Sequence, residues 1–224
     1  MICPSIGTPC GIGDYTSDLI KEMKNVDISR GCGVEEIGAT NDIYIFQFEY
    51  ALYNYVQSSS TVRALKAAGK TVVLSMHSYI WHEEFNDLLW QVDYFIIHNP
   101  LLRGRLKAMG IESGRIFRVD MGVLKTSPNQ KTRVELGIPA TSKVISAFGF
   151  IEKHKNFNML LEVLKLLRSG GRDVKLLLVS YAKNNPVSMQ ANAQFNEKVK
   201  SMDLSGDVIR VAENEFISME DVLG

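Results

Sequence analysis

Residues 43–76 read IYIFQFEYALYNYVQSSSTVRALKAAGKTVVLSM, and this stretch decides the fold. It begins with the apolar run IYIFQF (residues 43–48) and ends with the apolar run TVVLSM (residues 71–76). Both runs are nearly continuous rather than alternating, which is typical of strands that a parallel sheet buries on both faces. The two runs therefore predict neighbouring parallel strands.

A helix is expected between these two strands. Ser59 and Ser60 are residues that cap helix N-termini, and the segment from there to Ala68 has no helix breaker. Gly69 follows directly and is a typical C-terminal stop. The stretch thus predicts a strand, a helix and a second strand, which is the repeating unit of a parallel α/β sheet.

The same alternation continues along the chain. Further strands are predicted at residues 94–98 (YFIIH), 115–119 (RIFRV), 143–148 (KVISAF) and 173–180 (DVKLLLVS). Helices are predicted at residues 14–23, after a glycine-rich turn, and from Phe157 to the stop at Gly170 and Gly171. Right-handed crossovers between such elements give an α/β fold with doubly wound parallel sheets.

A polar stretch divides the chain into two parts. KTSPNQKTR (residues 125–133) has a proline and no apolar period, so we expect one Rossmann-like domain over residues 1–127 and another over residues 128–224. The second part contains only about three predicted strands, fewer than such a sheet normally uses. It is therefore expected to be incomplete.

The composition of the chain indicates which kinds of binding partner and which cellular location to expect. The 224 residues are 46% hydrophobic, and 25 basic residues balance 25 acidic ones, which argues against a nucleic-acid partner. The three cysteines match no zinc spacing and are interpreted as reduced thiols of a cytoplasmic protein. No signal peptide and no transmembrane segment is predicted. Peripheral contact with the inner face of a membrane stays open.

Candidate ligand-binding residues follow the predicted strands. In open α/β sheets, ligands bind beyond the carboxyl ends of the strands, so the residues at those positions matter most. They are Gly11 and Gly13 before the first helix, Glu49, His77, Gly122, Lys153 and Lys155. Glycines allow close approach of a ligand, and a helix N-terminus favours an anion. This pattern predicts a cleft site between two Rossmann-like domains.

Each of these residues also has a simpler interpretation. The turn lacks the third glycine of a dinucleotide fingerprint, so an ordinary tight turn explains it at least as well as an NAD site. His77 could be a hydrogen-bonded loop histidine, and Glu49 and the lysines could be solvated. His77 and His82 are five residues apart with no further ligand nearby in sequence, so no metal site is predicted.

The order of the motifs is more specific than any one of them. They are GIGDYT (residues 11–16), QFEYALY (47–53), VVLSMH (72–77), DYFIIHNPLLRGRLKAMGI (93–111) with RIFRVDMGV (115–123), and RVELGIPATSKVISAFGFIEKHKNFNMLLEVLKLLR (133–168). Together they resemble the N-terminal domain and the start of the C-terminal domain of glycosyltransferase family 4, whose members have the GT-B fold. The resemblance extends over roughly residues 5–180.

This resemblance implies a function. Members of the family transfer a sugar, with retention, from a nucleotide-sugar donor to an acceptor, here a UDP- or GDP-sugar and a glycan or lipid-linked glycan. They need no metal and no cofactor. By resemblance, Gly11 and Gly13 would lie near the acceptor and the donor phosphate, His77 near the transferred sugar, and Lys155 on the leaving diphosphate.

Three departures from the family pattern concern positions within the chain. Phe150 stands where the family usually has an arginine, and Lys153 is a candidate substitute. Met121 stands where the family has a histidine. Only about twenty residues separate the first predicted helix from residue 43, so we expect a strand–helix unit to be missing.

A fourth departure concerns the donor-binding carboxylates. The family has two glutamates eight residues apart, expected beyond Gly224, and Glu213 and Glu220 are seven apart in a segment that precedes that site. The alternative hypothesis is therefore a non-catalytic α/β binding module with the same fold. A dinucleotide-dependent oxidoreductase is a third and weaker hypothesis.

Overall fold

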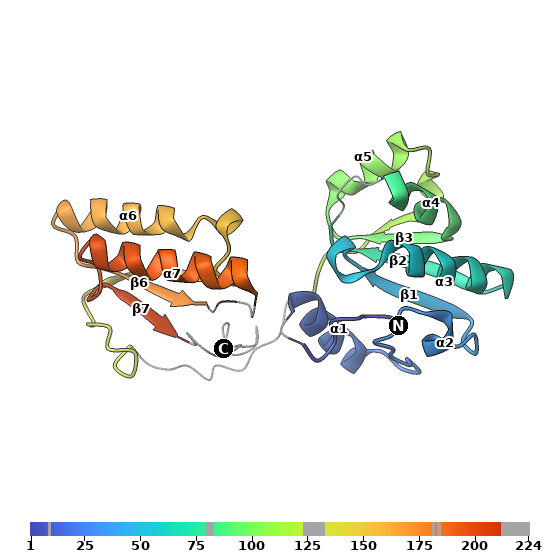
Figure 1. The fold of residues 1–224 in the computed structure, drawn as a ribbon, viewed down its shortest axis with the longest axis horizontal. Helices are drawn as coiled ribbons and strands as arrows, with labels where there is room; N and C mark the ends of the chain where they lie inside the picture. The colour runs from blue at the N-terminus through green and yellow to red at the C-terminus, as the bar shows by residue number, and fades with distance from the viewer. Residues whose placement is uncertain (9, 79–82, 123–132, 181, 183–184, 212–224) are drawn as a thin grey trace. The chain divides into compact units, whose positions relative to one another are not determined.

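A computed structural model describes residues 1–8, 10–78, 83–122, 133–180, 182 and 185–211 (Figure 1). The chain divides into two compact units, Met1–Leu124 and Lys125–Gly224. The predicted boundary between residues 127 and 128 lies outside the described residues. None of the described helices is both long and apolar enough to span a membrane.

The first unit contains a parallel sheet in the order β1-β2-β3-β4. Its strands are β1 (Ile43–Phe48), β2 (Thr71–Met76), β3 (Tyr94–Ile97) and β4 (Ile116–Arg118). All four predicted strands are confirmed, and β1 and β2 have the predicted bounds. Because the strands are parallel, their carboxyl ends meet at one edge of the sheet.

The N-terminal residues extend this sheet beyond β1. Ile2 forms parallel bridges with Phe46 on one side and with Ser29 on the other. The chain therefore runs outward from Ile2 through α1 (Gly11–Glu22) to Ser29, and then returns to the opposite side of Ile2 as β1. Such a reversal is a topological switch point, where open α/β sheets form their ligand-binding crevice.

The expected shortening before β1 is confirmed for the strand, since the described residues form no strand between α1 and β1. The single bridge at Ser29 and the four-residue helix α2 (Val34–Ile37) stand in its place. Glu36 holds this short segment together, because its Oε2 accepts hydrogen bonds from the backbone N–H groups of Cys32 (3.1 Å) and Gly33 (2.8 Å). The carboxylate thus satisfies two backbone N–H groups at the start of the short helix.

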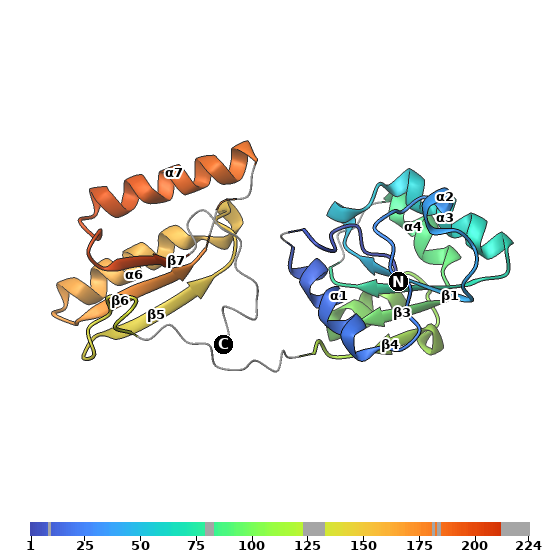
Figure 2. The same ribbon diagram turned by 90° about the horizontal axis from the view of Figure 1, so that it is seen from below.

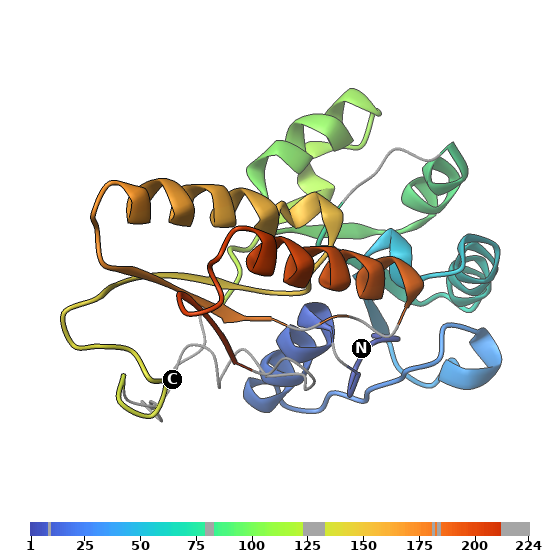
Figure 3. The same cartoon turned by 60° about the vertical axis from the view of Figure 1, so that its left-hand side comes forward.

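Helices cover both faces of the first sheet. They are α3 (Tyr55–Ala67), α4 (Glu83–Gln91) and α5 (Pro100–Ala108), with the short 3₁₀ turns η1 (Tyr50–Leu52) and η2 (Ser113–Arg115). Helix α1 lies on one side of the sheet and α3 and α4 lie on the other (Figures 2 and 3). Apolar residues on both faces of β1 and β2 are consequently buried, as the continuous apolar runs predicted.

Two helix starts differ from the predictions. Helix α1 begins at Gly11 rather than at residue 14, so the glycines belong to its first turn. Helix α3 begins at Tyr55, because Asn54 caps it with a side chain that accepts a hydrogen bond from the N–H of Gln57 (3.1 Å). The predicted cap at Ser59 is wrong, and Ser59 is buried inside the helix. Asparagine and serine are about equally good caps, so the sequence offered two starts.

The second unit contains a three-stranded parallel sheet in the order β5-β6-β7. The strands are β5 (Lys143–Phe148), β6 (Val174–Val179) and β7 (Val208–Val211). The helices are α6 (Phe157–Ser169) and α7 (Pro186–Ser201), and the 3₁₀ turn η3 (Lys153–Lys155) precedes α6. The prediction of about three strands is confirmed for the described residues.

Only one face of this second sheet is covered in the described part of the chain. Both crossovers, through α6 and then α7, run in the same direction and therefore place both helices on the same face (Figure 2). Leu176 and Leu178 of β6 point into that core, whereas Leu177 between them is half-buried and Phe148 of β5 is 55% exposed. The expectation that both faces are buried is therefore wrong for this sheet.

Ion pairs tie the amino ends of the strands in both units. In the first, Asp93 accepts hydrogen bonds from the backbone N–H of Val72 (2.7 Å) and from Lys66 (2.5 Å). In the second, the buried Asp207 pairs with Lys175 (2.7 Å) and Arg168 (2.9 Å). A charge-assisted bond to a partly buried carboxylate stabilises more than an exposed pair does. The amino edges are thus fixed by structural contacts.

Replacing Asp93 by Ala should lower the free energy of unfolding of the first unit by about 2 kcal/mol, because the Val72 N–H loses its acceptor. Asp87→Ala is the matched control. Its side chain is 71% exposed and lies 3.7 Å from Arg63, so its loss should cost about 0.5 kcal/mol or less. Both tryptophans lie in the first unit, so urea unfolding followed by tryptophan fluorescence reports on it. Equal losses in the two variants would contradict the role of Asp93.

Candidate functional site

Four polar side chains meet at the carboxyl edge of the first sheet. His77 directly follows β2, His98 directly follows β3, Gln47 belongs to β1, and Tyr15 comes from the first turns of α1. The ring centroids of His77 and His98 are 4.9 Å apart. Tyr15 packs edge-on against both, at 5.1 Å from His77 and 5.6 Å from His98. The switch point of the sheet therefore holds a cluster of three rings.

The hydrogen bonds of His77 define its tautomer. Its Nε2 lies 2.8 Å from Oε1 of the buried Gln47, and an amide oxygen only accepts, so Nε2 carries the proton. The amide nitrogen of Gln47 faces the sulfur of Met1 (3.3 Å), which fixes the orientation of the amide. The neutral ring then presents an unprotonated Nδ1, for which the described residues show no hydrogen-bond partner. That atom can accept a hydrogen bond from a hydroxyl group.

The surroundings of His77 keep it uncharged. Burial, and secondarily the neighbouring His98, lowers the pKa of His77 to about 4 from its ordinary value of 6.5. Burial also raises the pKa of Tyr15, which keeps the phenol protonated. At neutral pH, His77 and Tyr15 therefore offer uncharged hydrogen-bonding groups.

Glu49 lies next to this cluster because its carboxylate bonds to the residue that follows His77. It follows β1, is half-buried, and accepts a hydrogen bond from the hydroxyl of Ser78, the residue after His77. The backbone N–H of His77 also bonds to the carbonyl of Phe48, the residue before Glu49 (3.0 Å). The ends of β1 and β2 are thus joined, and Glu49 positions the chain beside His77.

Gly11 and Gly13, in the first turn of α1, lie on the same edge of the sheet. The two glycines differ in their surroundings. A Cβ atom on Gly13 would lie 2.3 Å from the carbonyl oxygen of Ser5, so only glycine lets α1 approach the loop after Ile2 this closely. Gly11 is exposed, and a Cβ there would meet nothing within 4 Å. Gly11 therefore leaves open space at the N-terminus of α1.

Gly122 is exposed at the end of the segment that follows β4. No contact joins it to the predicted residues His77 and Glu49 in the described structure. The same segment does begin at the cluster, because the carbonyl of Val119 bonds to Nδ1 of His98 (2.8 Å). The role predicted for Gly122 therefore stays a prediction.

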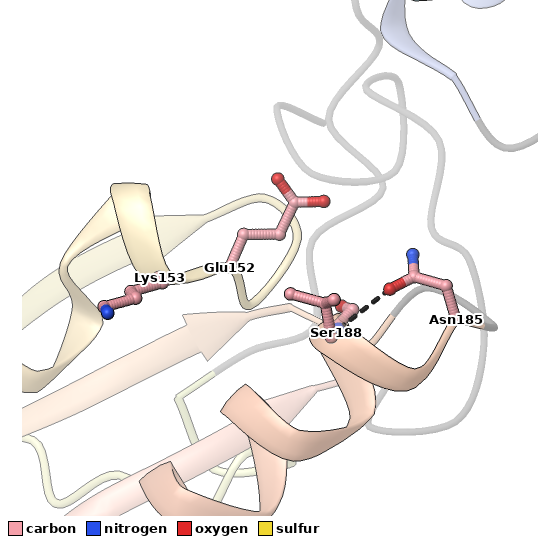
Figure 4. A pocket seen from close by; sticks show the side chains of 5 residues that line it. Glu152, Lys153, Asn185 and Ser188 are labelled. Carbon is pink, nitrogen blue, oxygen red and sulfur yellow. Dashed lines mark hydrogen bonds between the residues drawn. The ribbon is translucent and has the colours of Figure 1, made fainter.

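The predicted lysines belong to the second unit. Lys153 and Lys155 are both exposed in η3, which is followed by Asn156 in a left-handed conformation (φ 52°) and then by α6. A cavity of about 560 Å³ adjoins this turn and is lined by Glu152, Lys153, Asn185, Val187 and Ser188 (Figure 4). Lys155 is not among the residues that line it.

The N-terminus of α7 forms the other wall of this cavity. Asn185 caps the helix by accepting a hydrogen bond from the N–H of Ser188 (2.9 Å), drawn in Figure 4. The hydroxyl of Ser188 donates to the carbonyl of Ile151 (3.0 Å), which ties α7 to the turn after β5. The cavity thus combines Lys153 and Glu152 with the first turn of a 16-residue helix; the helix N-terminus and the lysine favour an anion, and the glutamate opposes one.

The sequence interpretation missed Tyr15, Gln47 and His98 in the first unit and the α7 wall in the second. His98 had a usable signal, since it ends a predicted strand on the same edge as His77. Tyr15 had none, because its place depends on how α1 crosses the sheet. No three His, Cys, Asp or Glu side chains within the described ranges come together in the manner of a metal site.

Gly13→Ala should destabilise the first unit by about 1–3 kcal/mol, because the added methyl group collides with the Ser5 carbonyl. Gly11→Ala is the control, since its methyl group would enter open space and should change stability by about 0.5 kcal/mol or less. Urea unfolding of the two variants measures the difference. A Gly13→Ala protein as stable as Gly11→Ala would rule out the close approach of α1.

The pKa of His77 predicts a pH dependence of stability. The unfolded chain takes up a proton at His77 near pH 6.5 and the folded chain only near pH 4, so the folded state loses stability as the pH falls between these values. The wild type should therefore lose more stability than His77→Gln between about pH 7 and about pH 5. Urea unfolding at both pH values tests this, and a parallel decline in the two proteins would contradict it.

The sequence matches no protein-family model and no curated protein. Solved structures do resemble the fold. Anabaena Alr3699/HepE in complex with UDP has a TM-score of 0.64 at 13% identity, over 89% of this chain and 58% of that one. Sucrose-phosphate synthase from Thermosynechococcus elongatus has a TM-score of 0.63 at 14% identity, over 84% and 51%.

A third similar structure is described as a UDP-N-acetylglucosamine 2-epimerase from Listeria monocytogenes, with a TM-score of 0.56 at 12% identity, over 94% of this chain and 61% of that one. The chain thus spans between half and about three fifths of the lengths of these three proteins. At such identities the likeness concerns the fold. The chain has the fold of GT-B glycosyltransferases, with Rossmann-like units of which the second is incomplete.

Proposed function

We propose that the protein binds a nucleotide-sugar donor, a UDP- or GDP-sugar, and takes part in retaining transfer of the sugar to a glycan or a lipid-linked glycan. The observation that carries the proposal is the state of His77. It is a half-buried, uncharged imidazole at the carboxyl end of β2, next to the switch point, and its Nδ1 has no hydrogen-bond partner among the described residues. Sugars present hydroxyl groups, which donate to such an acceptor.

The electrostatics of the first unit support a sugar there rather than a phosphate. A neutral imidazole and a protonated tyrosine add no positive charge, and Glu49 and Asp14 add carboxylates. Burial raises the pKa of Asp14, and its neighbour Asp18 raises it further. In the proposal, His77 and Glu49 contact sugar hydroxyl groups, and Gly11 and Gly122 allow the ligand to approach the backbone. Gly13 instead holds α1 against the carbonyl of Ser5.

The second unit supplies the positive groups that a nucleoside diphosphate requires. Lys153 borders the cavity at the N-terminus of α7, and Lys155 lies two residues further along η3. When the sugar leaves, negative charge develops on the diphosphate oxygens, and preorganised positive groups can each stabilise that charge by about 2.7–4 kcal/mol. Lys155 is proposed to contact the leaving diphosphate, with Lys153 in place of the arginine expected at Phe150.

The similar structures support the proposal at the level of the fold. The Anabaena protein has been crystallised with UDP, with UDP and glucose, and with UDP-glucose. A protein of the same fold is therefore known to hold the donor class proposed here. The acceptor is proposed from the resemblance of the sequence motifs, as are a cytoplasmic location and peripheral contact with the membrane.

A second candidate function is donor binding without transfer. Phe150 and Met121 replace an arginine and a histidine of the family pattern, and Glu213 and Glu220 lie outside the described residues. The similar Listeria structure is described as an epimerase, so this fold is not restricted to proteins described as glycosyltransferases. Binding of a nucleotide sugar with no sugar transfer would favour this candidate.

Calorimetric titration of the 224-residue protein with UDP, GDP and their sugars tests donor binding. Lys155→Ala should weaken the binding of the nucleoside diphosphates, and salt should weaken the wild-type interaction, because the contact is charge-assisted. Lys165→Ala is the control, since Lys165 is exposed on α6 and belongs to no proposed contact. If none of the nucleotides binds, both candidate functions fail.

His77→Ala tests the catalytic role. With the donor and a glycan acceptor, turnover of the folded variant should fall roughly a hundredfold, because a contact to the reacting sugar is lost. The melting temperature should also fall, because the buried Gln47 loses its hydrogen-bond partner, so turnover is measured well below it. Nucleoside diphosphate binding should be retained, since it depends on the second unit. Unchanged turnover would remove the role assigned to His77.

A further inference from the structure

His98 is held from two sides at the carboxyl edge of the first sheet. Its Nδ1 lies 2.8 Å from the carbonyl oxygen of Val119, which only accepts, so Nδ1 carries the proton. Its Nε2 lies 3.2 Å from Oγ of Ser75, a hydroxyl in β2 that is 2% exposed and can donate to it. Both ring nitrogens of His98 are therefore engaged by the protein, so they are not available to a ligand.

The fixed ring of His98 forms one wall around His77. The two imidazoles are tilted by 40° at 4.9 Å, and Tyr15 closes the other side with its ring nearly perpendicular to both. Within the described ranges, the ring of His77 is held by its Nε2 bond to Gln47 and by this packing. Without His98, the ring of His77 would have room to rotate and exchange its two nitrogens.

His98 also acts on the charge of His77. Among the described residues, the titratable groups that contacts place beside His77 are Tyr15 from α1, His98 after β3, and Glu49 after β1, which bonds to Ser78. His98 is the neighbour that opposes protonation of His77, because a second imidazole can carry positive charge itself, and it adds to the effect of burial.

We propose that His98 is a positioning residue for His77. It holds the His77 imidazole in one orientation and one tautomer, with Nδ1 unprotonated and available to a hydroxyl group of the ligand. That His77 meets a sugar hydroxyl rests on the proposed function. The effect of His98 on the orientation and the protonation of the His77 ring does not depend on any ligand.

The test uses ¹⁵N NMR titration of the histidines in the 224-residue protein without ligand. His98→Gln removes the ring and its charge but keeps a side-chain donor for the Val119 carbonyl. Ser75→Ala removes one of the two bonds that fix His98 and keeps both rings. Tyr94→Phe is the control, because Tyr94 starts the same strand at the opposite edge of the sheet. The His77 resonances are assigned from their loss in His77→Gln.

In the wild type, the His77 shifts should show a protonated Nε2 and an unprotonated Nδ1, with titration only near pH 4. In His98→Gln, the pKa of His77 should rise by about half a unit or more, and the two nitrogen shifts should move toward each other as tautomers mix. Ser75→Ala should change the pKa of His77 and its two nitrogen shifts in the same direction, but by less. Tyr94→Phe should leave them as in the wild type.

An unchanged His77 pKa and tautomer in a folded His98→Gln protein would overturn the proposal, even if that variant melts at a lower temperature. If His98→Gln does not fold, Ser75→Ala decides by the same criterion. A parallel titration with UDP-glucose separates this proposal from the proposed function. Absence of binding there counts against the function alone, since the ring shifts are measured without ligand.

Discussion

The parallel pairing of Ile2 between Ser29 and Phe46 is the constraint on which the first unit depends. It makes the chain reverse its direction across the sheet, so that α1 lies on the face opposite to α3 and α4. The same pairing brings the first turn of α1 against the loop after Ile2, which is why Gly13 tolerates no side chain. Tyr15 is then carried onto the ends of β2 and β3, where the two histidines lie.

The amino and carboxyl edges of each sheet carry different kinds of contact. At the amino edges, Asp93 and Asp207 hold neighbouring strands together through short charge-assisted bonds. At the carboxyl edge of the first unit, aromatic and imidazole rings surround His77, and in the second unit polar groups border a cavity beside the N-terminus of α7. The proposed ligand contacts thus lie at the ends of the strands opposite to the stabilising ion pairs, where open α/β sheets generally bind their ligands.

The sequence was sufficient for most strands and for the edge on which the site lies. The bounds of β1, β2 and β5 follow from apolar runs, because a parallel strand is a local pattern. The sequence does not predict the contacts that depend on how distant helices and strands pack together. The rings that Tyr15 contacts depend on how α1 crosses the sheet. The placement of α6 and α7 on the same face of the second sheet depends on both crossovers running in the same direction. The start of α3 was missed because two caps compete locally.

The central claim is that His77 is a neutral imidazole whose Nδ1 receives a hydroxyl group of the donor sugar. The most direct measurement is the ¹⁵N shift of His77 Nδ1 at neutral pH, recorded with and without a saturating UDP- or GDP-sugar and compared with the matching nucleoside diphosphate. The account predicts an unprotonated Nδ1 that changes its shift with the nucleotide sugar but little with the diphosphate alone. A protonated Nδ1, or a shift that no bound nucleotide sugar alters, would contradict it.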